Sequence, residues 1–223
     1  MDRLLLFDID GTLLHVAEEI AFARAFAEHC GAPVDLSFSP DMVLSDDGYV
    51  RGVLRRAALP HADAHVDAAL ARFVHHLHLG LASAELAVRP VAGAVEFVGG
   101  LRDAVALATG CVEGSARAKL GVIGLAARFP CGGFSHREQA RWEILERALH
   151  AAAAHYGRPF DRRAAVYFGD GVWDVAAAAA VGIGFVGINE HPDGRARLTA
   201  AGAGPVFADY SDPVAIRTAL ARL

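Results

Sequence analysis

Acidic and hydroxyl side chains follow three apolar segments of this sequence, each at the point where a buried strand would end. In chain order they are Asp8 and Asp10, Thr109, and Asp170 and Asp174. The carboxyl ends of parallel strands meet at one edge of an α/β sheet, so these side chains are expected to converge. A carboxylate can attack phosphorus, and carboxylate oxygens are the ligands that Mg²⁺ prefers. The pattern therefore predicts metal-assisted phosphoryl chemistry at the edge of a sheet.

The apolar segments that must position these residues are short and end in glycine or polar residues, which is typical of buried strands. They span 4–7, 105–108, 164–168, 184–188 and 205–208. Helical patterns lie between and after them, over 137–155, 172–181 and 213–223. Strands that alternate with helices predict an α/β fold, with a Rossmann-like parallel sheet covered by helices on both faces.

One long stretch interrupts this alternation. Residues 15–86 carry apolar side chains at helical spacing over 17–29, 49–58 and 62–78, and contain no convincing buried strand. We therefore expect an all-helical domain inserted after the first strand. The predicted division is a catalytic α/β core formed by residues 1–14 and 87–223 and a helical insert formed by residues 15–86.

Composition limits the classes of protein to which the chain can belong. Its 223 residues are 54% hydrophobic and 21% charged, which favours a well-filled core over disorder. The net charge of −5 argues against a broad nucleic-acid surface. Cys30, Cys111 and Cys131 lack metal-ligand spacing, which favours a reduced, cytoplasmic protein. No apolar run is long enough to span a bilayer without a charge, so no membrane partner is expected.

Three ordered motifs resemble those of the haloacid dehalogenase-like superfamily. Residues 8–12, Asp-Ile-Asp-Gly-Thr, are similar to its first motif, and Thr109 with Gly110 is similar to its second. Residues 169–174, Gly-Asp-Gly-Val-Trp-Asp, are similar to its acidic fourth motif. The helical insert lies where members with a C1-type cap carry that domain. The resemblance covers nearly the whole chain and implies a capped phosphatase similar to phosphoglycolate phosphatases.

The roles of the acidic residues follow partly from chemistry and partly from this resemblance. Asp8, at the end of a strand, suits a nucleophile, and a divalent cation is needed to hold it beside Asp170 because two carboxylates repel. The resemblance implies Mg²⁺, with the main-chain carbonyl of Asp10 as a further ligand and Asp174 orienting a metal-bound water. It also implies that the Asp10 carboxyl protonates the leaving oxygen and then activates water.

Phosphate contacts are expected from the second motif and from one cation. Thr109 offers a hydroxyl, and the amides of Gly110 and Cys111 offer N–H donors. The resemblance calls for a cation near the start of a helix, where Arg141 stands in place of the usual lysine. Lys119, the only lysine, is the rival candidate. It lies over two helical turns past the strand end, roughly 10–15 Å by helix rise, which favours Arg141.

Several alternatives remain open at this point. A phosphomutase would need the same residues, and a catalytically silent binding protein could share the fold. A dehalogenase is disfavoured because Asp10 has no role with a halide, and a phosphonatase because the insert contains no lysine. The expected partner is a small phosphorylated substrate, and the expected assembly is a monomer or a homodimer.

Two features of the insert bear on the substrate and on a second metal site. Residues 45–49 and Arg51 are plausible lining of a substrate pocket, although the substrate itself does not follow from the sequence. His75, His76 and His78 form a cluster that could suggest a metal. No acidic or cysteine partner accompanies them, so a solvated helix face is the favoured interpretation.

Overall fold

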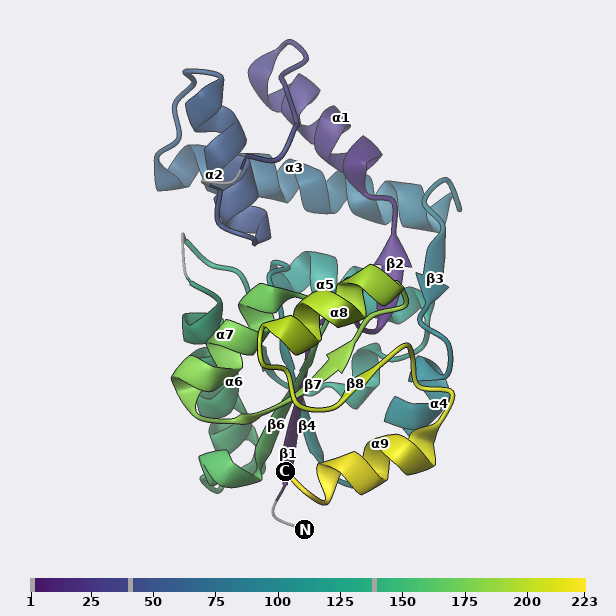
Figure 1. The fold of residues 1–223 in the computed structure, drawn as a ribbon. Coiled ribbons are helices and arrows are strands. Elements are labelled where there is room, and N and C mark those ends of the chain that lie inside the picture. The colour runs from purple at the N-terminus through teal and green to yellow at the C-terminus, as the bar shows by residue number, and fades with distance from the viewer. Residues whose placement is uncertain (1–2, 40–41, 138–139) are drawn as a thin grey trace.

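The central sheet has six strands, all paired in parallel (Figure 1). The computed structural model describes residues 3–39, 42–137 and 140–223. In sheet order the strands are β5 (Gly132–Gly133), β4 (Ala104–Ala108), β1 (Leu4–Phe7), β6 (Ala165–Gly169), β7 (Gly184–Ile188) and β8 (Val206–Phe207). The first strand of the chain therefore lies in the middle of the sheet, between β4 and β6.

Helices cover both faces of this sheet. One face packs against α4 (Ala94–Gly99), α5 (Glu113–Val122) and α9 (Pro213–Leu220). The other packs against α6 (Arg141–Tyr156), α7 (Val172–Val181) and α8 (Pro192–Ala200). Short 3₁₀ helices span Ala126–Arg128 and Arg162–Ala164. Over the described ranges, no helix has both the length and the apolar character needed to cross a bilayer.

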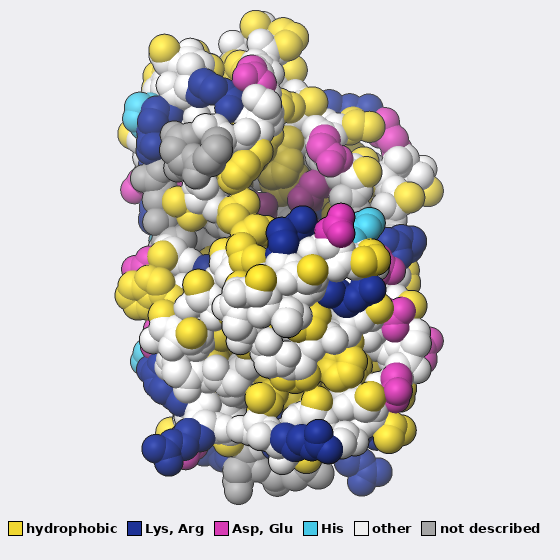
Figure 2. All heavy atoms as spheres, in the orientation of Figure 1, with side chains coloured by type: hydrophobic (Ala, Val, Ile, Leu, Met, Phe, Trp, Pro, Cys, Tyr) yellow, Lys and Arg dark blue, Asp and Glu magenta, His cyan; other side chains and the backbone are white. Residues whose placement is uncertain are grey.

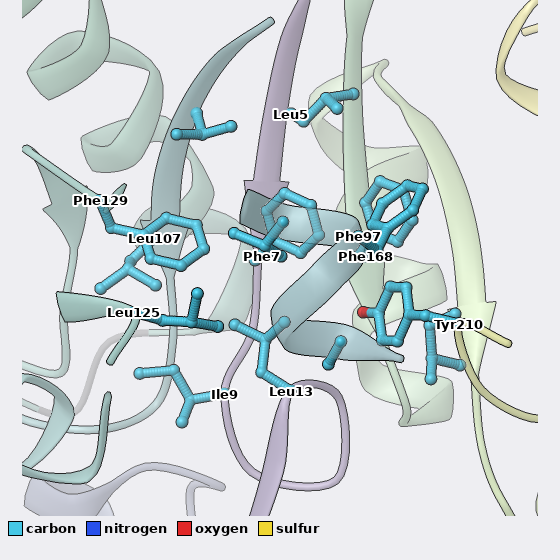
Figure 3. Close-up of a cluster of buried hydrophobic side chains, with 14 of the residues drawn as sticks. Leu5, Phe7, Ile9, Leu13, Phe97, Leu107, Leu125, Phe129, Phe168 and Tyr210 are labelled. Carbon is cyan, nitrogen blue, oxygen red and sulfur yellow. The ribbon is translucent and has the colours of Figure 1, made fainter. Parts of the chain in front are cut away.

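The side chains of β1 show why both faces are buried. Alternate residues of a strand point to opposite faces, so Leu5 and Phe7 enter one hydrophobic cluster while Leu4 and Leu6 enter the other. Phe7 stacks on Phe168 of the neighbouring strand, with ring centroids 4.5 Å apart (Figure 3). Burial on both faces fixes the end of β1 firmly within the molecule, which matters for the residue that follows it.

Three helices form a separate layer above the carboxyl ends of the strands (Figure 1). They are α1 (Glu19–Cys30), α2 (Asp46–Arg56) and α3 (Asp63–Ala82), and they enclose their own hydrophobic cluster. Phe22 of α1 stacks on Phe73 of α3 within it, with ring centroids 3.7 Å apart. The short strands β2 (Leu14–Val16) and β3 (Val88–Pro90) pair antiparallel and connect this layer to the sheet.

The predicted parallel α/β sheet, covered on both faces, is confirmed. The division into residues 1–14 with 87–223 and residues 15–86 stays a prediction. One helix start was wrong: α6 begins at Arg141, not at residue 137. Arg137 has a φ of 61°, a left-handed conformation that cannot belong to a right-handed helix. The next two residues of the expected helix, 138 and 139, lie outside the described ranges.

Helix α2 begins earlier than periodicity indicated, at Asp46 instead of residue 49. Ser45 provides the reason, because its hydroxyl accepts a hydrogen bond from the Gly48 amide at 3.2 Å. A capping side chain of this kind satisfies a backbone donor that has no partner within the helix. Because of this earlier start, the first turn of α2 contains Asp46 and Asp47 and lies against the α/β part of the molecule.

Candidate active site

Three carboxylates meet where β1 and β6 end. The Asp8 amide donates to the Phe168 carbonyl at 3.0 Å, so Asp8 extends the pairing of the two strands and its position is fixed. Asp170 follows β6, and Asp174 lies in the first turn of α7. Oxygen atoms of these three side chains lie within 4.8 Å of one another. The predicted convergence of residues far apart in the sequence is therefore present in the structure.

Gly11 allows Asp170 to approach the first motif. It has a φ of +78°, which favours glycine, and a Cβ at this position would lie 2.3 Å from the Asp170 Oδ2 atom. Any side chain here would both strain the backbone and displace a carboxylate of the site. The glycine in the Asp-Ile-Asp-Gly-Thr segment is thus explained by packing against the other acidic motif.

The electrostatics of the acidic cluster favour a cation. Burial raises the pKa of Asp8, although Arg141 opposes this effect. Burial also raises the pKa of Asp170 to about 8, and the charges of Asp8 and Asp174 add to the shift. Carboxylates that are buried close together strongly disfavour ionisation unless a positive charge compensates. An all-oxygen donor set of this kind fits Mg²⁺.

Asp174 differs from the other two carboxylates because the chain already binds both of its oxygens. The Tyr167 hydroxyl donates to Oδ1 at 3.0 Å, and the Gly171 amide donates to Oδ2 at 3.1 Å. The side chain is completely buried, and burial raises its pKa to about 6. These contacts suit a residue that orients its neighbours, while Asp8 and Asp170 are better placed to hold the ion directly.

Arg141 brings a positive charge to the same edge from the first turn of α6. Its Nη1 atom lies 3.7 Å from the Asp8 Oδ1 atom, and its Nη2 donates to the Leu44 carbonyl at 3.1 Å. Its Nε atom lies 3.3 Å from the Asp174 Oδ1 atom, and although Nε and Nη1 are buried beside these carboxylates, neither makes a hydrogen bond. A Cβ on Gly110 would lie 3.1 Å from Nη2, so glycine leaves room for the guanidinium. A guanidinium with free hydrogen-bonding capacity beside the strand ends suits an anionic ligand.

Lys119 also reaches the site, and the expectation that it lies too far away is wrong. Its Nζ atom is 2.8 Å from Asp10 Oδ2 and 2.7 Å from Glu18 Oε2, and the side chain is completely buried. Helix α5 begins only at Glu113, and helical side chains lean toward the N-terminus, so rise along the axis overestimated the distance. Burial opposes its charge, but the nearby carboxylates, of which Asp10 has the largest effect, more than compensate and raise the pKa of Lys119.

The two cations therefore occupy different positions. Arg141 faces Asp8, whereas Lys119 lies behind Asp10 and is enclosed by protein. The geometry favours Arg141 as the phosphate contact and gives Lys119 the task of holding the Asp10 carboxylate. Lys119 stood out in the sequence because it is the only lysine. Its position along the chain did not indicate which carboxylates it would contact.

The second motif is arranged differently from what was expected. The Cys111 amide donates to the Thr109 hydroxyl oxygen at 3.2 Å, so in this arrangement it does not face a phosphate. The Cys111 thiol donates to Asp10 Oδ2 at 3.0 Å, a contact that sequence reasoning missed. Thr109 is buried beside Asp8, and its hydroxyl helps to lower the pKa of that carboxyl against the larger effect of burial.

The N-terminus of α2 is docked on the loop after β4. The Asp46 amide donates to the Gly110 carbonyl at 2.8 Å, and the Val112 amide donates to Asp46 Oδ2 at 2.8 Å. A further bond joins the Asp47 amide to the Ser135 hydroxyl at 3.1 Å. The helical layer thus contacts the core directly beside the acidic cluster.

A cavity of about 520 Å³ opens between the helical layer and the strand ends. Figure 2 shows a hollow in this region whose walls carry hydrophobic and acidic side chains. Ser45 and Tyr49 of the expected segment line the cavity. Arg51 does not, because its guanidinium binds Asp47 and Asp63 within the helical layer. That part of the pocket hypothesis is wrong.

The histidine cluster of α3 takes no part in this site. His75 and His78 are exposed, and His76 Nε2 lies 2.9 Å from Glu28 Oε2. Among the described residues, the side chains arranged so that they could hold a metal ion are the three carboxylates at the strand ends, and no histidine is among them.

Comparison with known proteins identifies the family. A family model for haloacid dehalogenase-like hydrolases matches residues 3–182. The chain belongs to the haloacid dehalogenase-like hydrolases. No match was found among curated proteins.

Several solved structures share the fold of this chain at low sequence identity. A hydrolase from Pseudomonas syringae is 19% identical, with a TM-score of 0.67 and 96% of each chain covered. CbbY from Rhodobacter sphaeroides, solved in complex with phosphate, is 22% identical, with a TM-score of 0.61 and coverage of 95% of this chain and 96% of that one. A predicted phosphoglycolate phosphatase from Haemophilus somnus 129pt is 15% identical, with a TM-score of 0.63 and coverage of 96% and 97%.

Arg141→Ala tests which cation of this haloacid dehalogenase-like hydrolase binds phosphate. Hydrogen bonds to charged groups contribute about 1.5–3 kcal/mol, so inhibition by inorganic phosphate should weaken by at least about tenfold. The inhibition constant is measured beside Arg102→Ala, a control whose exposed arginine lies outside the cavity. Unchanged phosphate inhibition in Arg141→Ala would contradict the assignment.

Proposed function

We propose that this chain is a Mg²⁺-dependent phosphohydrolase that cleaves a small phosphate monoester through an aspartyl-phosphate on Asp8. The observation that carries the proposal is the set of side chains at the strand ends. Oxygens of Asp8, Asp170 and Asp174 lie within 4.8 Å of one another, and the Nη1 atom of Arg141, which makes no hydrogen bond, lies 3.7 Å from Asp8 Oδ1. An ion and an anion can both be held beside the same carboxylate.

In the first step, a carboxylate oxygen of Asp8 attacks phosphorus and the bond from phosphorus to the ester oxygen breaks. The departing oxygen takes a proton from the Asp10 carboxyl, which lines the same cavity. Arg141 holds the nonbridging phosphate oxygens. Mg²⁺, held by Asp8 and Asp170, supplies positive charge that offsets repulsion between the carboxylate and the phosphate.

In the second step, water attacks the phosphorus of the aspartyl-phosphate and gives its proton to the Asp10 carboxylate. The bond between phosphorus and the Asp8 oxygen breaks, which restores Asp8 and releases inorganic phosphate. Lys119 and the Cys111 thiol hold the Asp10 carboxylate in place, at 2.8 Å and 3.0 Å from its Oδ2 atom. Of the two paired side chains, Asp10 is the more exposed, with 41% of its side chain accessible, so water and substrate can reach it.

Phosphate release from phenyl phosphate, with Mg²⁺ or with a chelator, tests the proposal. The proposal predicts turnover that depends on the metal and ends in free phosphate, whereas a phosphomutase would pass the group to an acceptor. The absence of Mg²⁺-dependent release from any phosphate monoester would contradict it. The small phosphorylated partner, the monomeric or dimeric state and the cytoplasmic location stay predictions.

Substitutions of Asp170 and Asp174 in the acidic cluster should reduce Mg²⁺-dependent activity to different degrees. Asp170→Ala removes an expected direct ligand, so the concentration of Mg²⁺ needed for activity should rise steeply. Asp174→Ala removes a side chain that orients the site, and losses of this kind cost about 10–100-fold. A Mg²⁺ titration of activity in both variants makes the comparison. Equal activation of wild type and Asp170→Ala would contradict the metal site.

A further inference from the structure

The helical layer and its connecting segments contribute a group of apolar and aromatic side chains to the cavity wall. They include Phe22, Leu36, Phe38, Leu44 and Tyr49. Phe38 is 49% exposed and Leu44 is 38% exposed, which is high for large apolar groups. Exposed apolar surface gathered in a concave site favours an apolar ligand.

Tyr49 contributes its ring to this wall more than its hydroxyl. The hydroxyl donates to the Leu36 carbonyl at 2.6 Å, which satisfies its hydrogen-bond donor. The ring of Phe22 packs edge-on against the Tyr49 ring, with centroids 5.0 Å apart, and stacks on Phe73. These contacts hold the aromatic wall rigid, so it can bind a flat or aliphatic group with little loss of side-chain entropy.

Positive charge is absent from this wall. Among the described residues that line the cavity, only Arg141 and His15 can carry it. Arg141 faces Asp8, and His15 Nε2 lies 2.7 Å from Glu190 Oε2, a carboxylate that also binds Arg89. The six residues outside the described ranges include no lysine, arginine or histidine.

The other nearby cation is not available to a ligand. Lys119 is completely buried, and carboxylates of Asp10 and Glu18 lie within 2.8 Å of its Nζ atom. Glu18, Glu19 and Asp46 also line the cavity, and none of these carboxyl groups can form an ion pair with an anion. A second anionic group on the substrate would therefore lose its hydration without gaining an ion pair, which is costly.

We propose that the substrate is a phosphate monoester whose leaving alcohol has a neutral, apolar body and carries no second negative charge. The inference rests on the proposed function and narrows its substrate class. It separates this chain from enzymes that act on phosphorylated carboxylic acids such as phosphoglycolate, because the apolar wall carries no counter-charge for a carboxylate.

The test compares phenyl phosphate with 4-carboxyphenyl phosphate, a pair that differs by one carboxylate on the ring. With Mg²⁺ and wild-type protein, kcat/KM should favour phenyl phosphate by at least about tenfold, and phosphoglycolate should be a poor substrate. A kcat/KM for 4-carboxyphenyl phosphate or for phosphoglycolate that equals or exceeds the value for phenyl phosphate would overturn the inference and leave the proposed function intact. If phenyl phosphate, 4-carboxyphenyl phosphate and phosphoglycolate all remain intact, the proposed function itself fails, and the inference fails with it.

A matched pair of variants tests whether this wall sets the preference. Leu44→Arg places a cation in the cavity, and Leu79→Arg makes the same change at an exposed site of α3 outside it. Leu44→Arg should shift the ratio of kcat/KM toward 4-carboxyphenyl phosphate by at least about tenfold, and Leu79→Arg should leave the ratio unchanged. The same ratio in Leu44→Arg and wild type would overturn the role given to the wall. The wild-type comparison stands even if Leu44→Arg does not fold.

Discussion

Asp8→Asn should abolish phosphate release from every phosphate monoester that the wild type hydrolyses. An amide oxygen is a poor nucleophile, and a neutral side chain cannot balance the charge of a divalent cation. Loss of a catalytic nucleophile costs on the order of 10⁶ in kcat in a well-studied serine protease, so we expect a fall of at least about 10⁴-fold. Steady-state phosphate release, with enough enzyme to detect residual turnover, is the measurement.

Two controls separate this loss of chemistry from loss of structure. Asn has nearly the shape of Asp, and burial raises the pKa of Asp8, so removing the charge should leave thermal stability unchanged or higher. Glu96→Gln makes the same chemical change at an exposed position of α4 and should keep full activity. Activity of Asp8→Asn within tenfold of wild type would show that Asp8 is not the nucleophile.

Asp10→Asn should be the second most damaging change, with a different signature. General acid–base catalysis contributes about 10²–10⁴-fold, so steady-state turnover should fall by that factor. An ester with a good leaving group, such as para-nitrophenyl phosphate, needs little help in the first step. The variant should therefore still form the aspartyl-phosphate and then hydrolyse it slowly.

Rapid-quench kinetics distinguish this behaviour from a general loss of activity. Asp10→Asn should release a burst of para-nitrophenol, approaching one equivalent of enzyme, before a slow steady state. Asp209→Asn, a change at a half-buried acidic residue outside the cavity, should show wild-type kinetics. Normal rates for both steps in Asp10→Asn would refute the acid–base role.

Much of the acidic site could be predicted from the sequence because local signals defined it. Short apolar runs ending in polar residues located β1 and β6, and parallel strands bring their carboxyl ends together whatever the details of packing. Asp8 and Asp170 could thus be placed at one edge although most of the chain separates them.

The environment of Asp10 could not be predicted in the same way. Its contact with Lys119, and the contact of Lys119 with Glu18, depend on how α5 and the start of α1 pack against the turn after β1. Sequence distance and helix rise do not contain that information. The pairing of β2 with β3 was missed for a similar reason, since each strand has three residues and little periodicity can be seen in so short a segment.

Arg51 illustrates a third limit. Its charge and its place near the start of α2 suggested a substrate contact, but two carboxylates of the helical layer bind it instead. The direction that a charged side chain takes depends on its partners, in this case Asp47, one helical turn earlier, and Asp63 at the start of α3. Because Arg51 is held within the helical layer, it adds no charge to the apolar wall of the cavity.

The most direct test of the central claim is the mass of the protein after acid quench of Asp10→Asn with para-nitrophenyl phosphate and Mg²⁺. The account predicts a mass increase of one phosphoryl group, located by peptide mapping on the segment that contains Asp8. The increase should be absent without Mg²⁺ and in the double variant that also carries Asp8→Asn. Substrate turnover with no phosphorylated protein at any quench time, or a phosphoryl group on another residue, would contradict the account.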